Sequence, residues 1–178
     1  MSPTGKKIVS KSIAAKSAKK ASVPSLEGRK APAFELSDGT GTKVALKDLL
    51  KAGNLVLYFY PKDMTPGCTI EACSFRDHTR EIRALGAQVA GISADAPTSH
   101  AKFADKYDLK FPLLSDPENR VTRAYGVYKK KSLYGREFMG IERSTFIIDR
   151  SGVIRKVFPK VKVDGHSEQV LAALKEIG

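Results

Sequence analysis

Hydrophobic and polar positions alternate with a period of two in some stretches of the chain and with a helical period in others. Residues 31–46, APAFELSDGTGTKVAL, alternate apolar and polar side chains around the Gly-rich turn at residues 38–41, which predicts a β-hairpin. The continuous apolar run LVLYFY, Leu55 to Tyr60, is typical of a strand buried on both faces of a sheet. From Thr65 to Leu85 apolar residues recur at helical spacings, and Gly86 stands where a helix end is expected. The pattern therefore predicts a hairpin, a central strand and a long helix.

The rest of the chain continues this alternation and ends in two strands and a helix. The expected elements are a strand Gln88–Ser93, a helix Thr98–Tyr107, a short strand Pro112–Leu114, a helix Pro117–Tyr125, strands Ser144–Ile148 and Val153–Phe158 joined by a tight turn, and a helix Ser167–Ile177. Strands that alternate with helices and finish in an antiparallel pair build a mixed sheet between helical layers. The predicted fold class is α/β, a thioredoxin-like three-layer fold with a mixed central sheet and an N-terminal β-hairpin.

Length and composition are those of one globular domain. The chain has 178 residues, of which 42% are hydrophobic, so one core of ordinary size is expected, formed by residues 26–178. No apolar run approaches the roughly 20 residues that a membrane span needs, and the first 25 residues lack the apolar stretch of a secretory signal. We therefore expect no membrane partner and a cytoplasmic location, with the nucleus or an organelle as the alternative if the source is eukaryotic.

Positive charge is concentrated at the N-terminus. Residues 1–30 hold eight of the 31 Lys and Arg and one of the 19 Asp and Glu, so they carry +7 of the net charge of +12. Residues 1–25 are rich in Lys, Ser and Ala and offer too little apolar surface to offset the entropy of ordering, which predicts a disordered basic tail. Such a tail either stays solvated or makes weak contact with nucleic acid or another acidic surface.

Cys68 and Cys73 are the candidate reactive groups. Two cysteines five residues apart in a chain without a secretory signal are more readily catalytic or redox-sensing than structural, because the cytosol keeps ordinary thiols reduced. Thr65 is expected to be the N-cap of the long helix and Pro66 its first residue, which places Cys68 in the first turn. Unpaired backbone N–H groups and the positive end of the helix dipole favour a thiolate there. Cys68 is the predicted nucleophile.

A thiolate attacks either a peroxide oxygen or another sulfur. If the target is a peroxide, polar partners must align the O–O bond and stabilise charge on the departing oxygen. The Thr65 hydroxyl and the backbone N–H groups of the first helical turn can supply some of them. Arg143 is the preferred cation, because it directly precedes the strand Ser144–Ile148 and the binding sites of α/β sheets lie at the ends of strands. Arg123 is the second choice for this cation. The alternative is that Arg143 has no role in the site and only forms a surface ion pair with a neighbour such as Glu142.

Helix geometry constrains any reaction between the two cysteines. Residues five apart on a regular helix have Cα atoms on the order of 8.7 Å apart, whereas a disulfide rarely tolerates more than about 7 Å. A Cys68–Cys73 bond therefore requires the first turn and a half of the helix to unwind, and Gly67 in the first turn is consistent with low local stability. Otherwise, Cys73 is an ordinary core cysteine.

The residues around Cys68 resemble a known family. The segment PKDMTPGC matches the peroxiredoxin pattern Pro-x-x-x-Thr-x-x-Cys, and FYPKDMTPGCTIEACSFRD is similar to the peroxiredoxin Q branch, also called bacterioferritin comigratory protein. The likeness extends through GISADAP, YGVY, GIERSTFIID and VKVDGH and covers roughly residues 26–178. It implies a thiol-dependent peroxidase for hydrogen peroxide and organic hydroperoxides, in which Cys68 is the peroxidatic residue, Pro61 and Thr65 shape its pocket, and Arg143 supports the thiolate and the peroxide.

The same resemblance implies how the enzyme is recycled. Family members with a second cysteine five residues on use it as the resolving thiol, so Cys73 is expected to close an intramolecular disulfide that thioredoxin or a similar dithiol protein reduces. Many members of the branch are monomers, and a monomer is expected here. No cofactor and no metal are expected, because His78, His100 and His166 are scattered without the spacing of metal ligands.

Two other functions compete with the peroxidase. A disulfide oxidoreductase of the thioredoxin type usually carries Cys-x-x-Cys, whereas four residues separate Cys68 from Cys73, and slow reaction with peroxide would favour it. A nucleic-acid-associated protein would use the Lys-rich tail, and its DNA binding would be salt-sensitive and lost on removal of residues 1–25.

Overall fold

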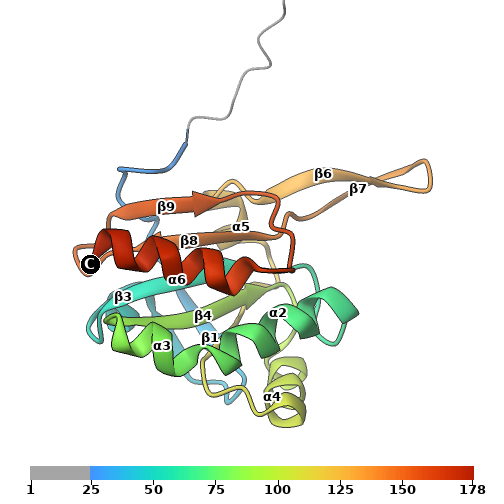
Figure 1. Ribbon diagram of the computed structural model, residues 1–178. Helices are drawn as coiled ribbons and strands as arrows, with labels where there is room; N and C mark the ends of the chain where they lie inside the picture. The colour runs from blue at the N-terminus through green and yellow to red at the C-terminus, as the bar shows by residue number, and fades with distance from the viewer. Residues whose placement is uncertain (1–24) are drawn as a thin grey trace, which may run out of the picture.

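A seven-stranded mixed sheet forms the centre of the protein, as the computed structural model shows for residues 25–178 (Figure 1). Its strands, in the order β2-β1-β5-β4-β3-β8-β9, are β1 (Glu35–Asp38), β2 (Lys43–Ala45), β3 (Asn54–Phe59), β4 (Ala87–Ser93), β5 (Leu113–Ser115), β8 (Ser144–Ile148) and β9 (Ile154–Phe158). β3, β4 and β5 run parallel, and the remaining pairs are antiparallel. The basic tail predicted for residues 1–25 lies, except for Ser25, outside the described residues.

Helices cover both faces of this sheet. They are α1 (Leu46–Leu50), α2 (Pro66–Asp77), α3 (Thr79–Ala84), α4 (Pro97–Tyr107), α5 (Arg120–Ala124) and α6 (His166–Ile177). Buried side chains of α2, α3, α4 and α6 share one cluster on one face, and those of α1 and α5 share a second cluster on the other. The predicted three layers, the mixed sheet and the β1–β2 hairpin are all present. Within residues 25–178, no helix is long and apolar enough to cross a membrane.

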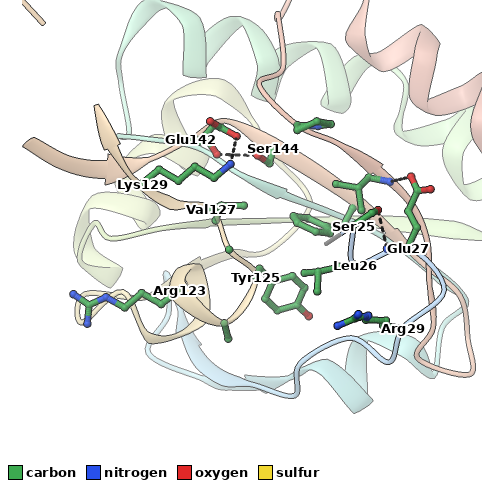
Figure 2. Close-up of a pocket in the computed structure, with 15 residues that line it drawn as sticks. Ser25, Leu26, Glu27, Arg29, Arg123, Tyr125, Val127, Lys129, Glu142 and Ser144 are labelled. Carbon is green, nitrogen blue, oxygen red and sulfur yellow. Dashed lines mark hydrogen bonds and ion pairs between the residues drawn. The ribbon is translucent and has the colours of Figure 1, made fainter. Parts of the chain in front are cut away.

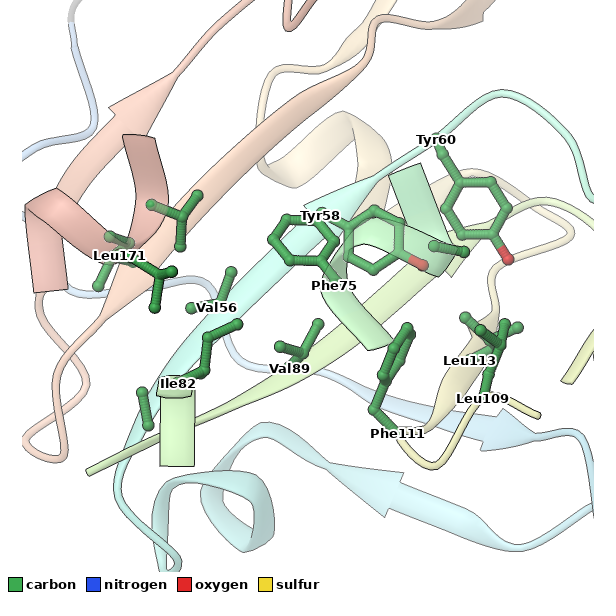
Figure 3. Packing of buried hydrophobic residues seen from close by; sticks show 14 of the residues in the cluster. Val56, Tyr58, Tyr60, Phe75, Ile82, Val89, Leu109, Phe111, Leu113 and Leu171 are labelled. Carbon is green, nitrogen blue, oxygen red and sulfur yellow. The ribbon is translucent and has the colours of Figure 1, made fainter. Parts of the chain in front are cut away.

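The cluster beneath α2 and α6 is built on the central strand (Figure 3). Because side chains alternate along a strand, Val56, Tyr58 and Tyr60 face this cluster while the intervening residues face the other, and all of them are fully buried. The Tyr58 ring lies 5.3 Å from that of Tyr60 and 5.0 Å from that of Phe75. A Cβ at Gly91 would lie 2.8 Å from the Tyr58 ring, so glycine at this position leaves room for the ring against β4. The prediction of a strand buried on both faces is confirmed.

Two helices are shorter in the structure than the sequence predicts. The helix predicted for Thr65–Leu85 breaks at His78 into α2 and α3, because the side chains of His78 and Thr79 bond to the carbonyls of Ser74 and Phe75 at 2.8 and 2.9 Å and compete with the backbone ladder. The helix predicted for Pro117–Tyr125 begins only at Arg120, since the residue before it, Asn119, adopts a left-handed conformation with φ 55°.

The sequence patterns also missed α1 and a second sheet, the hairpin of β6 (Tyr128–Leu133) and β7 (Arg136–Ile141). This hairpin extends beyond the rest of the structure at the right of Figure 1. Most of its side chains are exposed on both faces, so no alternation of apolar and polar residues marks it. Its turn residues Tyr134 and Gly135 both have positive φ, 50° and 75°, as the tight hairpin turn requires.

Replacement of a buried aromatic tests the packing of α2 on the sheet. Phe75→Ala is expected to lower the free energy of unfolding by about 3–5 kcal/mol, because it removes a ring that is 1% exposed and leaves a cavity against Tyr58. Phe138→Ala on the hairpin is the matched control: its ring is 45% exposed, and its loss is expected to change stability by less than about 0.5 kcal/mol. Urea unfolding of the reduced proteins measures both, and equal losses would contradict this packing.

Candidate active site

Cys68 lies at the edge of the sheet where the parallel strands end. The chain leaves β3 at Tyr60, whose N–H donates to the carbonyl of Ile92, and turns through a loop in which Met64 is forced to a positive φ of 64°. Thr65 is extended, and α2 begins at Pro66, so Cys68 occupies the first turn as predicted. Its side chain is 1% exposed and belongs to the cluster around Tyr58.

Thr65 takes the N-cap position of α2, but its hydroxyl does not cap the helix as predicted. Its hydroxyl donates to the carbonyl of Lys62 at 3.0 Å, and no side chain caps α2. The turn at Met64 folds the chain back and brings this carbonyl within reach of the hydroxyl. The first backbone bond of the helix is Thr69 N–H to the Thr65 carbonyl at 2.9 Å. The donors of the first turn are therefore left for a group beside Cys68.

Arg143 reaches Cys68 from the strand beside β3. β8 runs antiparallel to β3 with Ser144 opposite Phe59, so the residue before β8 sits next to the end of β3. Nη2 of Arg143 donates to Sγ of Cys68 at 3.3 Å. A Cβ at Gly67 would lie 3.2 Å from the same nitrogen, so glycine there gives the guanidinium room to approach. The structure brings together the two residues that were predicted to share the site.

The alternatives for this cation are wrong. The guanidinium of Arg123 lies over the ring of Tyr128, 4.8 Å from its centroid, on the other face of the sheet. Glu142, proposed as a surface partner of Arg143, instead pairs with Lys129 at 3.0 Å. Arg123 belongs to α5, which covers the face of the sheet opposite α2, so it cannot serve the Cys68 site.

Glu71 completes the site and was missed in the sequence. It lies three residues after Cys68 on the same side of α2, is 1% exposed, and forms an ion pair with Nη1 of Arg143. Burial raises the pKa of Glu71 to about 7 and outweighs the opposing effect of the Arg143 charge. The i, i+3 spacing from the nucleophile was the one available signal. Arg143 thus bridges a carboxyl group and a thiol.

Cys73 and Pro61 stand apart from this contact. Cys73 is half-buried in the same regular helix as Cys68, and both thiols are free. The helix therefore holds their Cα atoms on the order of 8.7 Å apart, beyond the reach of a disulfide. Pro61 is exposed and follows Tyr60 directly in the loop that leads to Cys68.

A pocket of about 440 Å³ lies on the opposite face of the sheet and is separate from this site (Figure 2). Tyr125 and Val127 form part of its wall, and Arg123 lies at its edge. Ser144 and Phe146 of β8 face it, whereas Thr145 bonds to His166 of α6 on the Cys68 side. The candidate active site is therefore the first turn of α2 and not this pocket.

Comparison with known sequences agrees with this geometry. Residues 28–157 match the AhpC/TSA family. The putative peroxiredoxin Bcp of Coxiella burnetii is 50% identical over 147 residues, which cover 83% of this chain and 97% of that protein. Peroxiredoxin Bcp of Bacillus subtilis is 48% identical over 150 residues, 84% of this chain and 95% of that one.

Solved structures extend the likeness to the fold. The bacterioferritin comigratory protein of Xanthomonas campestris superposes with a TM-score of 0.76 at 42% identity and covers 81% of this chain and 91% of its own. Peroxidoxin BcpB of Mycobacterium tuberculosis gives 0.77 at 41% identity, over 85% and 97%. The predicted thioredoxin-like α/β fold is confirmed. The match to the family model over most of the chain and these relatives together establish that the chain belongs to the AhpC/TSA family, in its Bcp or peroxiredoxin Q branch of peroxiredoxins.

Proposed function

We propose that this thiol peroxidase reduces hydroperoxides with Cys68 as the attacking residue and Cys73 as the resolving one. The observation that carries the assignment is the 3.3 Å contact of Arg143 Nη2 with the buried Cys68 sulfur at the first turn of α2. Peroxidase activity itself follows from the family, and the Xanthomonas campestris relative is described for alkyl peroxide reduction. Hydrogen peroxide and organic hydroperoxides are the substrates that we assign to this chain.

In the first step the Cys68 thiolate attacks one peroxide oxygen. An S–O bond forms, the O–O bond breaks, and the departing oxygen takes a proton to leave as water or an alcohol, while Cys68 becomes a sulfenic acid. Arg143 and the N–H groups of the first turn stabilise the thiolate and the charge that develops on oxygen. The Thr65 hydroxyl already donates to Lys62, so its oxygen is an acceptor for the peroxide O–H. Pro61, in the loop that leads to Cys68, forms one wall of the pocket that we assign to the peroxide.

In the second step Cys73 attacks the sulfenic sulfur. An S–S bond forms, and the sulfenic oxygen leaves as water. Because both residues belong to α2, its first turn and a half unwinds before the sulfurs meet. The disulfide is then exchanged with thioredoxin or a similar dithiol protein, which returns two thiols.

The oligomeric state and the cellular location that we propose follow from this cycle. An intramolecular disulfide needs no second subunit, which supports a monomer, with residues 26–178 acting as one domain. A dithiol reductant is available in the cytoplasm, which supports that location. Contact of the basic residues 1–25 with nucleic acid or another acidic surface stays a prediction.

The two cysteines are expected to have separable roles. Cys68→Ser should abolish peroxide consumption. Cys73→Ser should leave the rate of the first oxidation unchanged but stop thioredoxin-coupled turnover, so that sulfenic acid accumulates on Cys68. A single-turnover measurement with a sulfenic acid probe distinguishes the two variants. Peroxide consumption by Cys68→Ser at the wild-type rate would contradict the assignment.

The Arg143 contact is expected to accelerate the first step. Arg143→Ala should lower the rate constant for oxidation of Cys68 by hydrogen peroxide by about 10²-fold, because it removes a charged donor from the reacting sulfur. Arg123→Ala removes a cation from the other face of the sheet and should leave this rate constant unchanged. Stopped-flow mixing measures both rates, and the assignment is wrong if the Arg143 variant reacts like the wild type.

Glu71 is expected to give the fold a pH dependence. Its pKa is about 7 in the folded protein against 4.5 for the free group, so the folded state binds a proton more tightly than the unfolded state. The stability from this proton is fully present below about pH 4.5 and is lost as pH rises through 7. Relative to wild type, Glu71→Gln should therefore gain stability across this window, by at most about 3 kcal/mol.

Urea unfolding at pH 5, 6, 7 and 8 measures this gain. Both proteins carry Cys68→Ser, so that they differ only at position 71. A difference between the two proteins that stays constant with pH would contradict the raised pKa of Glu71.

A further inference from the structure

The reductant that we assign to this enzyme is itself a protein, so it needs a surface on which to dock beside Cys68 and Cys73. This inference rests on that proposed function and concerns how the reductant is recognised. We propose that the β6–β7 hairpin and the exposed side chains at the start of α2 form this docking surface, and that it fits a dithiol protein whose contact face is apolar and bordered by acidic side chains.

Exposed apolar side chains gather at one end of the molecule. Figure 1 shows that the hairpin projects on the same side as the start of α2. Exposed apolar groups that cluster rather than scatter mark contact surfaces, and tyrosine, phenylalanine, methionine and arginine are enriched in such surfaces. Among residues 25–178, six large hydrophobic side chains are exposed, and all of them lie on the hairpin, in the first half of α2 or directly before it: Met64, Ile70, Leu133, Tyr134, Phe138 and Met139.

These exposed side chains adjoin the two cysteines. Ile70 is 60% exposed and precedes Cys73 by three residues on α2, so the two side chains lie on the same side of the helix. On the hairpin, burial and the charge of Arg143 lower the pKa of Lys131, whereas the charge of Cys68 raises it. Charges act over this range only between groups that are near each other. The hairpin and the start of α2 therefore border the same reacting sulfurs.

One face of the hairpin carries both apolar and basic side chains. Lys131 is paired across the strands with Phe138, and Leu133 is paired with Arg136, so the alternation of side chains places these four on the same face. A Cβ at Gly140, also on this face, would lie 3.1 Å from Cδ of Lys131 and 3.4 Å from the Phe138 ring. Glycine there gives both side chains room. This face has no acidic residue of the hairpin.

The base of the hairpin is fixed to the domain, and its tip is exposed. The N–H of Glu142 donates to the carbonyl of Val127 at 2.7 Å, and Nζ of Lys131 donates to the carbonyl of Ile141 at 2.6 Å. Tyr134 at the tip is 95% exposed. The hairpin thus presents an aromatic side chain on an ordered support, which lowers the entropy cost of docking.

Charge and size favour an acidic protein as the partner. Arg136 forms no ion pair within residues 25–178, and Lys130 pairs with Glu137 on the other face of the hairpin. A second copy of this chain, with its net charge of +12, would bring cations toward the cations of the hairpin. A hydroperoxide is too small to cover both the hairpin and the start of α2. The dithiol reductant must reach the same sulfurs and is large enough to contact both.

Docking is tested by the rate at which thioredoxin recycles the full-length peroxidase. Tyr134→Ser, Phe138→Ser and Arg136→Glu should each lower kcat/KM for thioredoxin by about tenfold, as the loss of a dominant contact residue implies. With dithiothreitol, a small dithiol that needs no docking surface, the same variants should consume hydrogen peroxide at the wild-type rate. Stopped-flow oxidation of Cys68 by hydrogen peroxide should also be unchanged in all three.

Two control variants separate the docking surface from general effects. Ser132→Ala changes a side chain on the opposite face of the hairpin. Lys43→Glu makes the same charge reversal as Arg136→Glu, but on the exposed strand β2 at the edge of the sheet. Both should keep the wild-type kcat/KM for thioredoxin. An equal loss in Lys43→Glu and Arg136→Glu would show that only net charge matters, and wild-type values in all three hairpin variants would overturn the docking surface.

Other occupants of this surface would be recognised by different results. If the hairpin variants slow oxidation by cumene hydroperoxide but not by hydrogen peroxide, the surface serves the organic group of the substrate and the docking proposal is wrong. It is also wrong if sedimentation finds a wild-type dimer that these variants dissociate. If dithiothreitol recycles the wild-type protein and thioredoxin does not, the docking surface is overturned while the peroxidase stands. If neither dithiol recycles it, the proposed function itself fails, and the docking surface falls with it.

Discussion

The contact of the Arg143 guanidinium with the Cys68 sulfur on one side and the Glu71 carboxyl group on the other is the interaction on which the site depends. It joins the start of β8 to the first turn of α2 across the end of β3. A half-buried cation without these two partners would be costly, so the helix must present both groups on one side, three residues apart. Glycine at position 67 gives the guanidinium room to reach them.

The same interaction opposes the second half of the reaction. A thiol held in the first turn of a helix is stabilised as a thiolate and aligned with a peroxide, but the same helix keeps it out of reach of Cys73. In the cycle that we propose, the protein therefore alternates between a closed state that reacts with peroxide and an open state that forms a disulfide.

The sequence predicted most of what lies on the sheet and less of what lies around it. The apolar run of β3 and the Thr65-Pro66 pair located Cys68, and the position of Arg143 before a strand located its partner. Glu71 was missed because a glutamate on a helix ordinarily faces solvent, and its cation is 72 residues away in sequence. The break at His78 and the hydroxyl of Thr65 depend on single side-chain bonds to nearby carbonyls, and the β6–β7 hairpin lacks a buried face, so hydrophobic periodicity reports none of these features.

The most direct measurement is to treat the reduced full-length protein with one equivalent of hydrogen peroxide and to identify the oxidised sulfurs by peptide mass spectrometry. We expect rapid formation of one intramolecular Cys68–Cys73 disulfide, which requires both the reactivity of Cys68 and the unwinding of α2. Sulfenic acid that persists on Cys68 would remove Cys73 from the mechanism. Two intact thiols would contradict the assignment of Cys68.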